Sequence, residues 1–95
     1  MNKLKKQEID EELTKLNAWS LADNKIEKAL KFKDFVETFA FMTQIALLAE
    51  RMGHHPDWTG GYNELHIALT THSAGGLTRK DFELAKEIDR LLKNK

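Results

Sequence analysis

The sequence predicts an α+β fold in which three helices pack on one face of a four-stranded antiparallel sheet, in the order α-β-β-α-β-β-α. Three observations predict it. Longer segments repeat apolar residues at helical spacing, shorter segments alternate them at strand spacing, and glycine or Asp-Asn turn signals separate the segments. Because antiparallel sheets commonly expose one face, the second face of this sheet should be open to solvent or to a partner.

The first helix is expected within residues 5–16, where Ile9, Leu13 and Leu16 recur at 3.6-residue spacing. A β-hairpin is expected next, in the segment NAWSLADNKIEKALKF, with Asp23-Asn24 as its turn. The side chains that share a face are Trp19 and Leu21 before the turn, and Ile26, Lys28, Leu30 and Phe32 after it.

The second helix should begin at Asp34, because Glu37 follows three residues later in a pattern typical of a capping box. Gly53 should end it, since glycine adopts the left-handed conformation at little cost. The expected apolar stripe of this helix consists of Phe35, Phe39, Met42, Ile45, Ala46, Ala49 and Met52.

A second pair of strands is expected over residues 56–59 and 62–71, with Gly60-Gly61 turning the chain between them. In the longer strand Leu65, Ile67 and Leu69 alternate with polar or small residues. After Gly75-Gly76, Thr78 should cap the last helix. Its expected buried face consists of Phe82, Ala85, Ile88, Leu91 and Leu92.

The length and the composition of the chain limit the functions that it can have. A chain of 95 residues is expected to form one domain over 1–95, with a core too small to enclose a deep pocket alone, so we expect a groove that a second copy could complete. The 15 basic and 15 acidic residues cancel, which gives no general attraction to nucleic acid or to an anionic membrane. The absence of cysteine excludes disulfides and thiolate chemistry. No segment is apolar enough for a signal peptide or a membrane span, which favours a cytoplasmic location.

The segment GHHPDW, residues 53–58, is the first candidate site. Pro56 disfavours helical geometry at His55, and Gly53 ends the helix just before His54, so the two rings should point in different directions. One histidine could transfer a proton while the other holds a ligand. The alternative is that both are exposed polar residues near the negative end of a helix dipole.

Four more polar side chains need an interpretation. His72 follows a strand and precedes a glycine-rich loop, a common place for functional groups. His66 is expected on the surface of its strand. Asp81 either completes the cap at Thr78 or orients a histidine. Glu50, one turn before His54, is either a surface acid or a partner of a ring or substrate.

Other kinds of site find little support in the sequence. Trp58 and Tyr62 belong either to the core or to the walls of a groove for a planar ligand. A metal site is not expected, because His54 and His55 cannot easily aim at one ion and no His-Glu-x-x-His motif is present. Phosphate-binding glycine loops and a nucleophile elbow are also missing from the sequence.

The chain resembles the pterin-4a-carbinolamine dehydratases, a family also known in animals as the dimerisation cofactor of a homeodomain transcription factor. The family pattern is an acid, three residues, His-His-Pro, an aromatic, a later histidine and then an aspartate. The flanks FKDFVETFAFMTQIALLAE and YNELHIALTTHSAGGLTRKDFELA are also similar, so the resemblance covers residues 17–92. The matching positions are Glu50, His54-His55-Pro56, Tyr62, His72 and Asp81.

The resemblance implies a hydro-lyase that removes water from 4a-hydroxytetrahydropterin, giving the quinonoid dihydropterin, for aromatic amino-acid hydroxylases. It implies no metal or organic cofactor, and a homodimer or homotetramer. The implied main acid/base is His54, with His72 assisting at the 4a-hydroxyl and Asp81 holding a catalytic histidine. The implied catalytic residues are His54, His55, His72 and Asp81, and the implied substrate-binding residues are Glu50, His55, Pro56 and Trp58.

Two other functions stay open at this point. The chain could act as a dimerisation or regulatory partner of a transcription factor or a hydroxylase, with no direct contact to nucleic acid. It could also be a pterin-binding domain with a new role, for example in molybdopterin metabolism. The complete set of His54, His55, His72 and Asp81 favours the enzyme, because a scaffold would not need it.

Overall fold

A computed structural model describes residues 2–95 of the chain. Within them the predicted order of three helices and four strands is confirmed, and a short 3-10 turn is added. The elements are α1 (Lys6–Leu13), β1 (Ser20–Ala22), β2 (Lys25–Lys31), α2 (Phe35–Met52), β3 (Asp57–Gly60), β4 (Glu64–Leu69), the turn η1 (His72–Ala74) and α3 (Arg79–Lys93).

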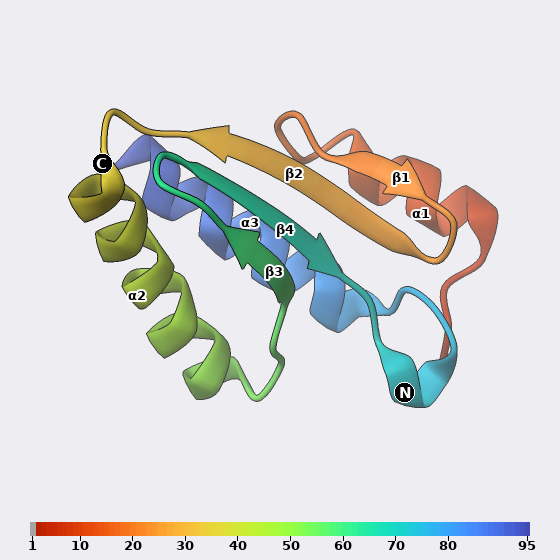
Figure 1. The fold of residues 1–95 in the computed structure, drawn as a ribbon. Coiled ribbons are helices and arrows are strands. Elements are labelled where there is room, and N and C mark those ends of the chain that lie inside the picture. Colours follow the sequence, from red (N-terminus) through yellow and green to blue (C-terminus); the bar gives the residue numbers. More distant parts are fainter. Residues whose placement is uncertain (1) are drawn as a thin grey trace.

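The strands form an antiparallel sheet in the order β1-β2-β4-β3. In Figure 1 α1 and α3 lie behind this sheet, α2 runs beside it at the lower left, and the other face of the sheet is turned to the viewer. The predicted alternation in β4 is confirmed, because Leu65, Ile67 and Leu69 are at most 1% exposed. His66 lies on the exposed face, as predicted.

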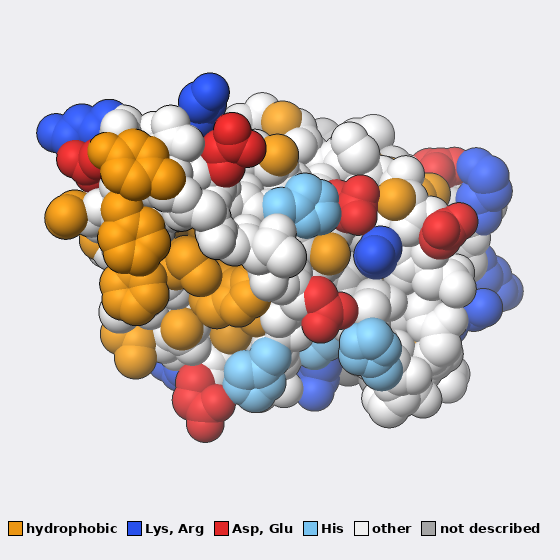
Figure 2. All heavy atoms as spheres, in the orientation of Figure 1, with side chains coloured by type: hydrophobic (Ala, Val, Ile, Leu, Met, Phe, Trp, Pro, Cys, Tyr) orange, Lys and Arg blue, Asp and Glu red, His pale blue; other side chains and the backbone are white. Residues whose placement is uncertain are grey.

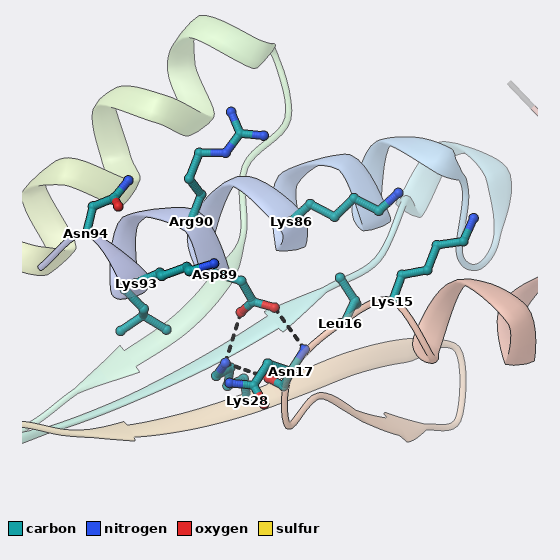
Figure 3. Close-up of a pocket in the computed structure, with 10 residues that line it drawn as sticks. Lys15, Leu16, Asn17, Lys28, Lys86, Asp89, Arg90, Lys93 and Asn94 are labelled. Atoms are coloured by element: carbon teal, nitrogen blue, oxygen red, sulfur yellow. Dashed lines mark hydrogen bonds and ion pairs between the residues drawn. The ribbon is translucent and has the colours of Figure 1, made fainter.

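The hairpin of β1 and β2 turns at Asp23, which has a φ of +55°. Lys28 is in register with Ile67 on the core side of the sheet, so its ammonium group is buried. That group donates to Asn17 O at 2.6 Å and to Asp89 Oδ1 at 2.9 Å (Figure 3). A buried cation is tolerable because both acceptors satisfy it, and the cluster ties β2 to α3.

The predicted cap of α2 is confirmed. The Asp34 carboxylate accepts the backbone N–H of Glu37 at 2.9 Å. The Glu37 carboxylate bonds to the N–H of Lys33, one residue before the position that a capping box would use.

The predicted apolar stripe of α2 is wrong in part. Phe35 and Phe39 are 50% and 55% exposed, and Ala46 is exposed. The helix is apolar on more than one side, and the sheet and α3 pack against the side next to the predicted one. The buried side chains are Thr38, Phe41, Ile45, Leu48 and Ala49.

Helix α3 packs as predicted through Phe82, Ala85 and Ile88, each at most 1% exposed, with Leu91 and Leu92 partly buried. No helix within residues 2–95 is long and apolar enough to cross a membrane.

Helix α1 is joined to α3 by Glu12, which lies within salt-bridge distance of three cations. The Glu12 carboxylate is 3.0 Å from Lys15 Nζ, 3.4 Å from Lys86 Nζ and 3.6 Å from Arg79 Nη1. The hydrogen bond from Lys15 lowers the pKa of Glu12 below its ordinary value of 4.5, with help from Lys86 and against the effect of burial. The ionised carboxylate therefore stabilises the folded chain at neutral pH.

We expect Glu12→Gln to lower the free energy of unfolding at pH 7 by up to about 1 kcal/mol. Because the folded-state pKa is the lower one, this contribution is present above pH 4.5 and is lost as pH falls through the lowered pKa. Urea unfolding of wild type and variant at pH 7 and pH 3 measures it. Glu11→Gln, on the exposed side of α1, is the control, and an equal loss at both pH values would contradict the ionic explanation.

Candidate active site

The backbone at the end of α2 places the two adjacent histidines. Gly53 takes a φ of +67°, its N–H bonds to Glu50 O, and the N–H of His54 bonds to Ala49 O at 3.1 Å. These two bonds form a Schellman motif, in which the left-handed residue satisfies the last carbonyl groups of the helix. His54 is thus fixed to the helix end, and Pro56 leads the chain into β3.

His54 is paired with a buried acid. Its Nε2 lies 2.5 Å from Asp81 Oδ1, and the two side chains are 11% and 0% exposed. A carboxylate only accepts hydrogen bonds, so Nε2 carries the proton that it donates to Asp81. In the neutral ring the lone pair is then on Nδ1, the nitrogen free for proton transfer.

Asp81 stands in the first turn of α3 and its other oxygen is also held. Asp81 Oδ2 accepts the backbone N–H of Thr78 at 2.9 Å and the hydroxyl of Thr71 at 2.9 Å. The contact with Thr78 is the expected contribution to the cap, and the contact with His54 has the geometry that the alternative requires, so one side chain has both sets of contacts. Thr71 was not singled out in the sequence, because a threonine at a strand end carries no motif.

His55 has a different partner. Its Nε2 lies 2.8 Å from Glu50 Oε1, and both side chains are largely exposed. The two neighbouring rings therefore pair with separate acids, one buried and one at the surface. The rings point in different directions, as expected from Pro56.

His72 begins η1, just after β4, and is 81% exposed. Its Nε2 lies 3.4 Å from Asp57 Oδ2. Asp57 was not predicted as a site residue. It is the first residue of β3 and is in register with Ala68 of β4, so the antiparallel pairing brings it near the segment that ends at His72. In all three pairs the acid lies at Nε2.

The aromatic candidates lie at opposite ends of β3. Trp58 is half-buried and packs against the core, opposite Ile67. Tyr62 is 67% exposed and follows the turn at the far end of the strand. The structure therefore groups His54, His55 and His72 near the start of β3 and leaves Tyr62 at the other end of the strand.

Figure 2 shows histidine and acidic side chains gathered along the lower edge of the open side of the molecule. In the same orientation, the end of α2, the start of β3 and the end of β4 meet at this edge (Figure 1). Within residues 2–95 no group of three or more His, Asp or Glu side chains has the arrangement to hold a metal ion.

A hollow of about 740 Å³ lies elsewhere, between the α1–β1 connection and α3 (Figure 3). Lysine and arginine side chains, with Asp89, line much of it. None of its lining residues is a histidine, and the oxygens of Asp89 are occupied by Lys28, Trp19 and Asn17. This hollow therefore has no side chain suited to proton transfer near neutral pH, whereas the edge that carries His54, His55 and His72 has three.

Comparisons with known proteins agree on one family. The family model described as pterin 4 alpha carbinolamine dehydratase matches residues 2–91. Relatives from Sulfurisphaera tokodaii and Solibacter usitatus, each named "Putative pterin-4-alpha-carbinolamine dehydratase", are 50% and 49% identical to the chain. The alignments cover 97% and 94% of this chain, and 99% and 94% of the relatives.

A solved structure from Brucella melitensis, described as a transcriptional coactivator/pterin dehydratase, has the same fold. It superimposes with a TM-score of 0.91 at 39% identity, over 95% of this chain and 98% of that one.

Proposed function

Because this chain belongs to the pterin-4a-carbinolamine dehydratase family, a family of lyases, we propose that it dehydrates 4a-hydroxytetrahydropterin by histidine acid/base catalysis. The observation that carries the proposal is the buried His54–Asp81 pair, which leaves His54 Nδ1 free at the molecular edge that also holds His72. We propose that the reaction recycles tetrahydropterin for aromatic amino-acid hydroxylases in the cytoplasm.

The reaction is an elimination. The C4a–O bond breaks, a base takes the proton of the neighbouring ring nitrogen, an acid delivers a proton to the leaving hydroxyl, and water and the quinonoid dihydropterin are the products. The proton taken and the proton delivered balance, so no oxidant or reductant is consumed. Histidine suits both steps because its unperturbed pKa is about 6.5.

Within this proposal His54 is the main acid/base and acts through Nδ1. Asp81 accepts a hydrogen bond from the Nε2–H group, holds the ring and stabilises its charged form. His72 assists at the 4a-hydroxyl. Its pairing with the exposed Asp57 leaves it accessible to substrate.

His55 and Glu50 are proposed to bind and orient the pterin, and their largely exposed positions suit that role. Pro56 fixes the direction of the chain between the two rings, which matters because a misplacement of about 1 Å can cost on the order of 10²-fold in rate. The exposed part of Trp58 is proposed to contact the planar ring.

The test is dehydration of freshly prepared 4a-hydroxytetrahydropterin, followed by absorbance with and without the purified protein. We expect the protein to increase the rate above the spontaneous one and a chelator to leave that increase unchanged, since the proposal uses no metal or organic cofactor. Folded protein without any effect on the rate would refute the activity. Loss of activity in chelator that is restored by Zn²⁺ would refute the metal-free mechanism.

We also propose that the protein is a homodimer or homotetramer that uses the exposed side of α2. Val36 and Leu47 are 78% and 68% exposed and lie on the same helix as the exposed Phe35 and Phe39. Figure 2 shows apolar side chains gathered in a patch over α2. Exposed apolar patches of this kind mark interaction sites.

Light scattering after size exclusion tests the assembly. We expect wild type to be larger than one chain and Val36→Glu to shift it to a smaller species, because a buried carboxylate would be unpaired. Gln7→Glu, at an exposed position of α1 outside the patch, is the control and should leave the mass unchanged. A monomeric wild type would refute the assembly.

A second candidate function is regulation of a protein partner. The Brucella melitensis structure is described as a transcriptional coactivator as well as a dehydratase. In this chain the same α2 patch would receive a transcription factor or an aromatic amino-acid hydroxylase, with no direct contact to nucleic acid. Binding of such a partner by wild type and its loss in Val36→Glu would support this function.

A further inference from the structure

We infer that Thr71 is the positioning residue that fixes both acid/base histidines of the proposed reaction. Its hydroxyl acts through Asp81 on His54, and its backbone holds the turn that carries His72. The catalytic meaning of this inference rests on the proposed function, whereas the effect of Thr71 on the His54 ring does not.

The direction of the hydroxyl hydrogen bonds follows from the chemistry of the groups. Asp81 as a carboxylate only accepts, so Thr71 donates its single hydroxyl proton to Oδ2 at 2.9 Å. The contact of 2.8 Å between the hydroxyls of Thr71 and Thr78 must then have Thr78 as its donor. The chain of bonds therefore runs from Thr78 through Thr71 to Asp81, and His54 donates to the same carboxylate from the other side.

Burial makes this arrangement rigid. Asp81 and Thr78 are 0% exposed and Thr71 is 8% exposed. Two donors on Oδ2 stop rotation of the carboxylate, which leaves Oδ1 aimed at His54 Nε2. Without the Thr71 hydroxyl, Oδ2 would keep the Thr78 N–H alone, and a site closed to solvent supplies no ready replacement.

The backbone of Thr71 holds the other histidine. Its N–H bonds to Gly76 O at 3.0 Å, and its carbonyl accepts the N–H of Ala74 at 3.0 Å and that of Gly76 at 3.3 Å. His72 is the next residue, at the start of the turn that these bonds close. Thr71 therefore holds the His54 ring through its side chain and the backbone at His72 through its main chain.

Thr71→Val keeps the side-chain shape and the backbone but removes the hydroxyl, so it separates the two effects. We expect kcat to fall about 10-fold, the size of one hydrogen bond to a charged group, with KM changed less than about twofold. We expect ¹⁵N NMR to show the single Nε2–H form of His54 replaced by a mixture of tautomers, with His72 unchanged. Thr71→Ser, which keeps the hydroxyl, should restore both the rate and the spectrum.

Thr70→Val is the matched control. Thr70 directly follows β4, next to Thr71, and its hydroxyl donates to Asn24 O at 2.6 Å, with no contact to Asp81. The Thr70→Val substitution should change neither kcat nor the His54 spectrum. Thr71→Ala provides a second variant, and circular dichroism identifies those that fold.

A folded variant lacking the Thr71 hydroxyl, with wild-type kcat and an unchanged His54 spectrum, would overturn the inference. An effect of equal size in Thr70→Val would also overturn it, because the loss would then be general. If wild type does not accelerate dehydration, the proposed function fails, and the NMR comparison still decides whether Thr71 positions His54.

Discussion

His54→Ala is expected to lower kcat for dehydration by about 10²–10⁴-fold, the usual contribution of a positioned acid/base group, while the protein stays folded. The loss should exceed that of any other single histidine. His54 is the histidine whose Nε2 is bound to a buried carboxylate and whose Nδ1 remains free. KM should change little, because binding is proposed to rest on His55 and Glu50.

The measurement is kcat of wild type and variant on the same substrate preparation, with the spontaneous rate subtracted. His66→Ala is the matched control, since His66 is an exposed histidine on the open face of β4 and has no proposed role. Added imidazole should restore part of the activity in His54→Ala, because the lost ring leaves space beside Asp81.

Wild-type kcat in His54→Ala would show that His54 is not the acid/base group, and His72 would become the next candidate for that role. A variant that loses activity together with its circular dichroism spectrum would show a structural role instead. The addition of imidazole separates these cases, because imidazole can restore activity to a folded variant but not to an unfolded one.

The strands and the helix ends were predictable because each depends on local chemistry. In β4 the alternation of Leu65, Ile67 and Leu69 has the same period as the strand, so one register satisfies it. Gly53 and Asp34 mark the ends of α2 through bonds to residues within five positions along the chain. Such short-range bonds are visible in a sequence.

The buried side of α2 was not predictable in the same way. Both the Phe35–Phe39 side and the Phe41–Leu48 side are apolar, so periodicity alone cannot choose between them. Packing against the sheet decides in favour of Phe41 and Leu48, 2% and 5% exposed. The unused apolar side is the one for which we propose a second copy or a partner.

The residues of the candidate site also include some that could be predicted from the sequence and some that could not. His54, His72 and Asp81 could be identified from their types, their spacing and the family resemblance. Asp57 and Thr71 could not, because their contacts depend on strand pairing and on a turn that closes across Gly76. In a chain this short the acids and hydroxyls that orient the histidines come from different elements, and the tertiary structure alone brings them together.

The second large effect is expected at Asp81, where one side chain serves both the helix cap and the catalytic histidine. Asp81→Ala should lower kcat by about 10²-fold or more and the free energy of unfolding by about 1–3 kcal/mol. The rate falls because His54 loses the acceptor that fixes its tautomer and stabilises its charge. The stability falls because the Thr78 N–H and the Thr71 hydroxyl are left buried without an acceptor.

Asp34→Ala is the control that separates these effects. Asp34 caps α2 by accepting the Glu37 N–H at 2.9 Å, so its loss also removes a cap, at a cost of about 1 kcal/mol, and it touches no histidine. We expect Asp34→Ala to lose stability and keep its activity. Urea unfolding and kcat are measured for both variants.

Asp81→Asn sharpens the test because it keeps the size of the side chain. An amide has one acceptor oxygen, so it can satisfy the donors of Thr71 and Thr78 or that of His54, but not both sets. If the oxygen keeps the cap, the amide N–H faces His54 Nε2 and forces the ring proton to Nδ1. Asp81→Asn should then keep more stability than Asp81→Ala and remain as inactive. Full activity in Asp81→Asn would mean that the His54 tautomer does not limit the reaction, and Asp81 would be left with its structural role alone.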